Sequence, residues 1–195
     1  MKIMAIVAMA MAVGMSARAE QALLVNVEDV NSVPPPVLRR AQDLADEMFA
    51  GVGVRIEWRE GRPKPSQGEP AIVVHMAIDT PTEFVPGAFA FARVHEGVHI
   101  TVFWDRVQRR TNSLAAGVVL GHVLVHEITH ILQGIDRHSE TGVMKARWTG
   151  EDFSQMTWKP LPFTRDDIYL IQRGLATRAD AGAVVAVNSA SQTQP

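Results

Sequence analysis

The segment from residue 112 to residue 133 restricts the possible folds more than any other part of this chain of 195 residues. Asn112 or Ser113 at its start and Gly134 after its end are typical of helix boundaries. Between them, apolar residues occupy nearly every side of a helix: Leu114, Val118, Leu120, Leu124, Val125, Ile128, Ile131 and Leu132. A helix that is apolar nearly all round lies inside a protein, so the rest of the chain must cover it.

Ionisable residues interrupt this apolar helix in the pattern His126-Glu127-x-x-His130. Residues four apart on a helix are separated by about 6 Å along one face, so two imidazoles can bind one metal ion. Metal binding also satisfies two buried rings at once. A glutamate between two such histidines is unusual in a buried helix unless it has a function. We therefore interpret His126 and His130 as metal ligands rather than as core histidines that hydrogen-bond to their neighbours. His122 is too far from His130 to bind the same ion, so we expect it to pack in the core or to support the metal ligands.

The same motif occurs earlier, as His95-Glu96-x-x-His99. Its flanks, residues 89–94 and 98–103, have the alternation of two strands joined tightly through Glu96 and Gly97. Four residues along a strand span about 13 Å, so these imidazoles need not converge. We expect them to be exposed hairpin histidines.

A catalytic zinc ion requires three protein ligands and an open position for water. Gly134 permits a left-handed turn that ends the long helix and returns the chain toward the metal. Asp136 and His138 are the two candidates that this turn could deliver. We choose His138, and Asp136 remains the alternative.

The segment from residue 126 to residue 144 resembles the zinc endopeptidases of the metzincin superfamily, and most closely the matrixin-like branch. That family has the pattern His-Glu-x-x-His-x-x-Gly-x-x-His, which matrixins follow with Ser and a methionine turn. The residues that resemble this pattern are His126, Glu127, His130, Gly134, His138, Ser139 and Met144. The glycine comes one residue late and the third histidine two residues late, where the strict spacing gives Asp136.

The resemblance implies an α+β fold, with a mixed twisted sheet backed by helices, a buried active-site helix and a Met-turn. It implies one catalytic Zn²⁺ on His126, His130 and His138, with Glu127 as general base in peptide-bond hydrolysis and Met144 beneath the metal. It also implies an edge strand that binds a peptide or protein substrate, for which we choose Phe89, Ala90, Phe91 and Ala92. The alternative is an exported zinc-binding interaction module without catalytic activity.

The remaining patterns predict a single domain over residues 20–175. Residues 22–27, 54–58 and 71–78 are expected to be strands, and a helix is expected after the prolines at 34–36. A capping-box pattern at 164–167 starts a last helix that ends near Leu175. Residues 176–195 are expected to be a flexible tail.

The first 19 residues have the plan of a secretory signal peptide, with Ala17 and Ala19 before the cleavage point. The sequence contains no cysteine, which excludes disulfides and thiolate sites and suits an exported protein, periplasmic or extracellular. The net charge of −2 argues against a nucleic-acid partner. After signal cleavage we expect a monomer that has no membrane partner.

Overall fold

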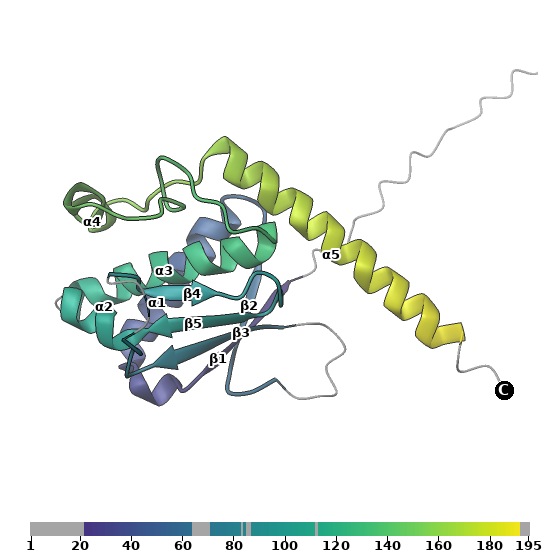
Figure 1. The fold of residues 1–195 in the computed structure, drawn as a ribbon, viewed down its shortest axis with the longest axis horizontal. Helices are drawn as coiled ribbons and strands as arrows, with labels where there is room; N and C mark the ends of the chain where they lie inside the picture. The colour runs from purple at the N-terminus through teal and green to yellow at the C-terminus, as the bar shows by residue number, and fades with distance from the viewer. Residues whose placement is uncertain (1–21, 64–70, 83, 85–86, 112, 192–195) are drawn as a thin grey trace, which may run out of the picture.

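The computed structural model describes residues 22–63, 71–82, 84, 87–111 and 113–191. These residues form strands and helices that are mixed along the chain, as Figure 1 shows. The elements are β1 (Leu23–Glu28), a short 3-10 helix (Val30–Ser32), α1 (Pro35–Ala50), β2 (Ile56–Glu60), β3 (Ile72–Ala77), β4 (Ala90–Ala92), β5 (His99–Phe103), α2 (Trp104–Arg110), α3 (Ser113–Gln133), α4 (Gly150–Met156) and α5 (Arg165–Ser191).

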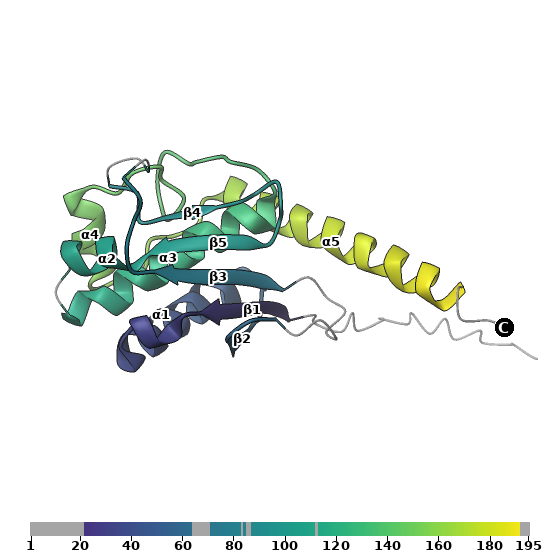
Figure 2. The same cartoon turned by 60° about the horizontal axis from the view of Figure 1, so that its bottom comes forward.

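The strands form one mixed sheet in the order β2-β1-β3-β5-β4. The first four strands of that order pair in parallel, and β4 pairs antiparallel with β5 at the edge. Helices α1 and α3 lie together against one face of the sheet (Figure 2). The expected mixed sheet backed by helices is therefore confirmed.

Helix α3 forms the centre of the core, as its apolar composition predicts. Its residues Ala115–Gln133 have the length and hydropathy of a membrane span, but 89% of that window is buried inside the protein. Gly121 lets α1 approach closely, because a Cβ there would lie 3.0 Å from the carbonyl oxygen of Ala41 and 2.9 Å from Leu44. Close packing of this kind holds in place the helix that carries His126, Glu127 and His130.

The C-terminal helix is longer than the sequence patterns predict. Helix α5 begins at Arg165 as expected but continues to Ser191, well past the expected end near Leu175. Residues 176–191 include six alanines, and alanine has the highest helix propensity of all residues. Residues 192–195 and the expected signal peptide at residues 1–19 lie outside the described part of the chain.

Candidate metal centre

Helix α3 brings the imidazoles of His126 and His130 together on one face. Their ring centroids are 4.7 Å apart and their Nε2 atoms are 3.1 Å apart. Both residues are buried, with 9% and 4% of their surfaces exposed. The spacing of one helical turn thus produces the geometry that the motif predicts.

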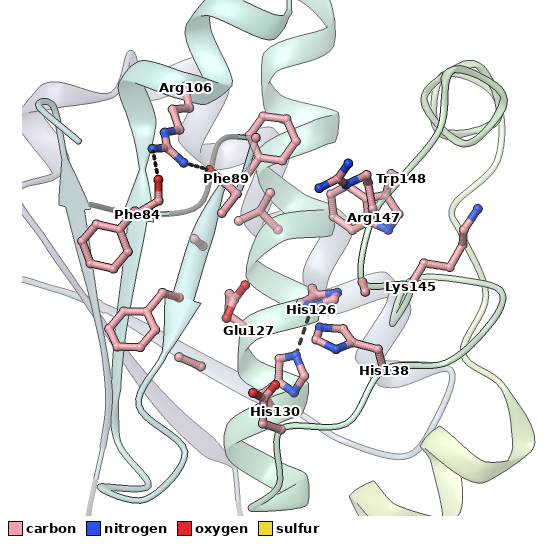
Figure 3. Close-up of a pocket in the computed structure, with 18 of the residues that line it drawn as sticks. Phe84, Phe89, Arg106, His126, Glu127, His130, His138, Lys145, Arg147 and Trp148 are labelled. Atoms are coloured by element: carbon pink, nitrogen blue, oxygen red, sulfur yellow. Dashed lines mark hydrogen bonds between the residues drawn. The ribbon is translucent and has the colours of Figure 1, made fainter. Parts of the chain in front are cut away.

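His138 reaches the same point from the loop that follows α3. Gly134 adopts a positive φ of 68° and its amide donates to the carbonyl of His130, which ends the helix and reverses the chain. The His138 ring then lies 5.3 Å from the His126 ring and 4.9 Å from the His130 ring. Nitrogens of the three residues lie within 4.8 Å of one another, so this histidine cluster could hold a metal ion (Figure 3). Asp136 lines the same cleft but is not a member of the group.

Backbone carbonyls select the tautomers of two members of the histidine cluster. Nδ1 of His126 is 2.8 Å from the carbonyl oxygen of Val143, and Nδ1 of His130 is 3.2 Å from that of Ile135. A carbonyl oxygen only accepts, so each Nδ1 carries the proton and each Nε2 presents a lone pair. Two lone pairs that face each other cannot form a hydrogen bond, whereas a divalent cation between them satisfies both.

The protonation state of the two helix histidines also suits metal binding. Burial lowers the pKa of His126 to about 3, and the neighbouring His130 contributes in the same direction. Burial likewise lowers the pKa of His130. Both rings are therefore neutral at pH 7, the form that ligates zinc at Nε2. The donor set of this chain fits a zinc ion.

Glu127 lies on the side of the histidine cluster that faces β4 (Figure 3). Its side chain is almost wholly buried, with 8% of the residue exposed. Burial raises its pKa to about 8, Asp136 adds to the rise, and a hydrogen bond from the backbone of Ala92 partly offsets it. A carboxylate with a pKa near neutrality can both accept and return a proton.

The loop that follows His138 supports the histidine cluster. The amide of Ser139 donates to the carbonyl of Met144 at 2.8 Å, which closes a turn containing Gly142 with φ of 77°. Val143 and Met144 are fully buried, and the Val143 carbonyl is the acceptor for His126. The residues expected to form a Met-turn thus make a closed turn whose last two residues, Val143 and Met144, are buried and whose Val143 carbonyl contacts His126.

A buried carboxylate on α5 ties down both neighbours of His138. Asp167 is fully buried and accepts from the Ser139 hydroxyl at 2.6 Å and from the Arg137 guanidinium at 3.0 Å. Its other oxygen accepts from the amide and hydroxyl of Thr164, at 2.9 and 2.7 Å. We call Asp167, Arg137 and Ser139 the loop clamp, because together they hold the chain on either side of the third histidine.

The strand expected to bind substrate borders the cleft above the histidine cluster. Phe89, Ala90, Phe91 and Ala92 all line the cleft, together with His126, Glu127 and His130. Among the described strands, β4 pairs only with β5, so its other edge is free of strand partners. The cleft thus contains the three histidines, Glu127, the four strand residues and Asp136, which lies outside the histidine cluster, while Met144 is buried in the turn that follows His138 and does not line the cleft.

His95, His99 and His122 lie outside the histidine cluster, although His95 also lines the cleft. His95 and His99 are exposed at the β4–β5 turn, and His99 contacts Glu96 at 2.8 Å. His122 is fully buried: its Nδ1 donates to the Val118 carbonyl, and its Nε2 accepts from the amide of Leu161. Its role is therefore structural, as expected of a residue too far from His130.

A second group of possible ligands gives no comparable site. Glu28, Asp29 and His75 have ligand atoms within 4.8 Å of one another. His75 already contacts Asp29 at 2.7 Å, and Arg62 lies 3.5 Å from Glu28. The group is mostly exposed, and its carboxylates already have partners, so we assign it no function.

Comparisons with known proteins agree with this architecture at the level of the fold. No protein-family model and no curated protein matches the chain. The crystal structure of archaemetzincin from Methanopyrus kandleri is similar, with a TM-score of 0.58 and 18% sequence identity over 83% of this chain and 99% of archaemetzincin. This likeness establishes a shared mixed fold of a five-stranded sheet and helices. It does not distinguish the matrixin-like branch, which stays a prediction.

Proposed function

We propose that this chain is a zinc-dependent metallopeptidase that hydrolyses peptide bonds. One observation carries the proposal: three imidazoles from α3 and the following loop converge beside the buried carboxylate of Glu127, at the bottom of a cleft bordered by an edge strand. The archaemetzincin-like fold supports the same conclusion independently.

Zinc bound by His126, His130 and His138 supplies a Lewis acid that lowers the pKa of water and polarises a carbonyl group. Glu127 accepts the proton of the attacking water and returns it to the leaving amine nitrogen. Val143 and Ile135 hold the two helix imidazoles in the tautomer that leaves Nε2 unprotonated.

An extended peptide would bind along the free edge of β4, over Phe89, Ala90, Phe91 and Ala92, through main-chain hydrogen bonds. This mode engages residues on both sides of the scissile bond and therefore favours endopeptidase action. The order of Gly134, His138, Ser139 and Met144 along the chain, although not their exact spacing, supports a relation to the matrixin-like metzincins, with Met144 as the floor of the metal site. The signal-peptide pattern supports export to the periplasm or the extracellular space.

The replacement Glu127→Ala tests the mechanism. We expect the variant to keep its zinc and to lose at least about 1,000-fold in kcat/KM, because the general base is removed while all three ligands remain. Zinc content by mass spectrometry and cleavage of a mixed peptide library measure the two effects. Retained hydrolysis would contradict the mechanism.

The alternative is an exported zinc-binding interaction module without catalytic activity. It predicts a different result for the same measurements: one zinc ion per chain, and no cleavage of the peptide library by the unsubstituted protein. A purely structural domain would bind no zinc and would keep its stability when His126 is replaced.

A further inference from the structure

Three aromatic side chains from separate segments form a box beside the histidine cluster. Phe89 stacks with Trp148 at 6.4 Å, and Phe153 packs edge-on against both, at 6.1 and 6.2 Å. All three residues line the cleft and are only half buried. The Trp148 ring is 5.8 Å from that of His126, and its Nε1 donates to the Val143 carbonyl at 3.2 Å, which fixes its orientation. We call these three residues the aromatic box.

Six basic residues line the same cleft, and four of them have partners within the protein. Carboxylates pair with three of the four, and backbone carbonyls accept from the fourth. The pairs are Arg93 with Glu96, Arg109 with Asp105, Lys145 with Asp152, and Arg106 with the carbonyls of Phe84 and Ala88. The positively charged groups of these four residues thus already have partners within the protein.

The remaining two, Arg110 and Arg147, are exposed at the aromatic box. The Arg110 guanidinium lies over the Phe153 ring, 5.2 Å from its centroid, and Arg147 stands beside Trp148 (Figure 3). Within the described residues, neither has a carboxylate within ion-pair distance. The chain as a whole has a net charge of −2, so this excess of positive charge is local.

We propose that the aromatic box and its two arginines bind a carboxylate of the substrate, and that the enzyme therefore prefers acidic peptides. The guanidinium groups pair with the carboxylate, and the aromatic faces contact the methylene groups that carry it. The Trp148 ring lies 5.8 Å from the His126 ring, and an extended peptide advances about 3.4 Å per residue, so we expect a side chain that contacts Trp148 to belong to a residue close to the scissile bond. This inference rests on the proposed peptidase function and adds its substrate class.

The test compares peptides that differ only by Glu or Gln at the positions flanking the cleavage site. We expect the unsubstituted enzyme to cleave the better-placed Glu peptide with a kcat/KM about tenfold above that of its Gln counterpart. The double variant Arg110→Gln with Arg147→Gln should lose this ratio. Arg109→Gln is the matched control, because Arg109 lines the same cleft but is paired with Asp105, and it should keep the ratio.

Two further arms identify the source of the carboxylate and separate the two proposals. Amidation of the peptide C-terminus should leave kcat/KM unchanged for both peptides if the acidic side chain is bound, and should lower kcat/KM equally for both if the terminal carboxylate is bound. Fluorescence anisotropy measures the binding of labelled Glu and Gln peptides to the zinc-loaded Glu127→Ala protein. This binding reports recognition without cleavage. Cleavage with equal rates for all peptides would overturn the acidic preference alone. Tighter binding of the Glu peptide, without cleavage by the unsubstituted protein, would overturn the peptidase function alone.

Discussion

The Nε2 atoms of His126 and His130 are 3.1 Å apart, and a metal ion held by them still needs a third protein ligand. The ring of His138 completes the cluster, whereas Asp136 lies outside it. We expect His138→Ala to lose bound zinc and Asp136→Ala to retain one zinc ion per chain. Metal analysis of the purified variants after dialysis against a low zinc concentration measures this. Zinc loss from Asp136→Ala alone would reverse the assignment.

Asp167 is a fully buried carboxylate that its neighbours keep ionised. Burial raises its pKa, but hydrogen bonds from Ser139, Thr164 and Arg137 outweigh that effect and lower the pKa overall. The replacement Asp167→Asn leaves the Arg137 guanidinium without its buried partner. We expect it to reduce the free energy of unfolding at pH 7 by about 3 kcal/mol, measured by chemical denaturation.

The same variant has a defined pH dependence. Because folding lowers the pKa of Asp167, its stabilisation is present above the unfolded pKa of about 4 and is lost as the pH falls through the folded value. The stability difference between the parent protein and Asp167→Asn should therefore narrow below about pH 4. Asp166→Asn is the control: its carboxylate is exposed and 3.5 Å from Arg137, so the expected change is below about 1 kcal/mol. Equal effects of the two replacements would contradict the loop clamp.

At the scale of helices and strands, the described strands and the long helices were predictable, whereas the seven-residue helices α2 and α4 were not. The apolar run of α3, the alternation of β5 and the capping box of α5 each give a local signal that the structure confirms. Helix α2 follows β5 directly, and no side chain caps its start, so nothing in the sequence marks its first turn. Helix α4 did carry a signal, since Thr149 and Asp152 form a capping box, but seven residues are too few to show helical periodicity.

The crossing of α5 over the end of α3 depends on a glycine. A Cβ at Gly174 would lie 1.7 Å from the carbonyl oxygen of Leu132, and backbone cannot move aside as a flexible side chain can. We expect Gly174→Ala to lower the free energy of unfolding by roughly 3 kcal/mol, with a matching fall in Tm. Gly150→Ala, where nothing lies within 4 Å, is the control and should change the stability little. Equal Tm values for the two variants would exclude this close contact.

At the scale of the whole molecule, metal binding should be linked to folding. The ligands come from α3 and from the loop that α5 holds, so an ion at the cluster binds the native arrangement and not the unfolded chain. Removal of zinc with a chelator should lower Tm by several degrees, and added zinc should restore it; free zinc at 1,000 times Kd corresponds to about 4 kcal/mol. His126→Ala should show no response to the chelator. A parent protein that is also insensitive would indicate that the cluster binds no structural or catalytic ion.

Half of the site could be predicted because it lies on one helix, and half could not because folding assembles it from distant segments. His126, Glu127 and His130 follow from spacing alone, and Gly134 suggested where the chain would turn. The loop clamp and the aromatic box unite residues that no local pattern connects. Trp148 could be noticed only as one aromatic residue among several, since its contact with Phe89 depends on the tertiary fold.

Helix α5 also determines when the site can form during synthesis. Besides Asp167, it contributes Arg178, whose guanidinium donates to the carbonyls of Gly97 and Ile131 and so joins the β4–β5 turn to the end of α3. A nascent chain that ends before Arg165 contains all three histidines and Glu127 but lacks the Asp167 carboxylate that holds Arg137 and Ser139. In the proposed peptidase, the His138 loop therefore becomes fully anchored only after the first turn of α5 has been synthesised. Under the proposed export and peptidase activity, this order would limit proteolysis inside the cell that makes the protein.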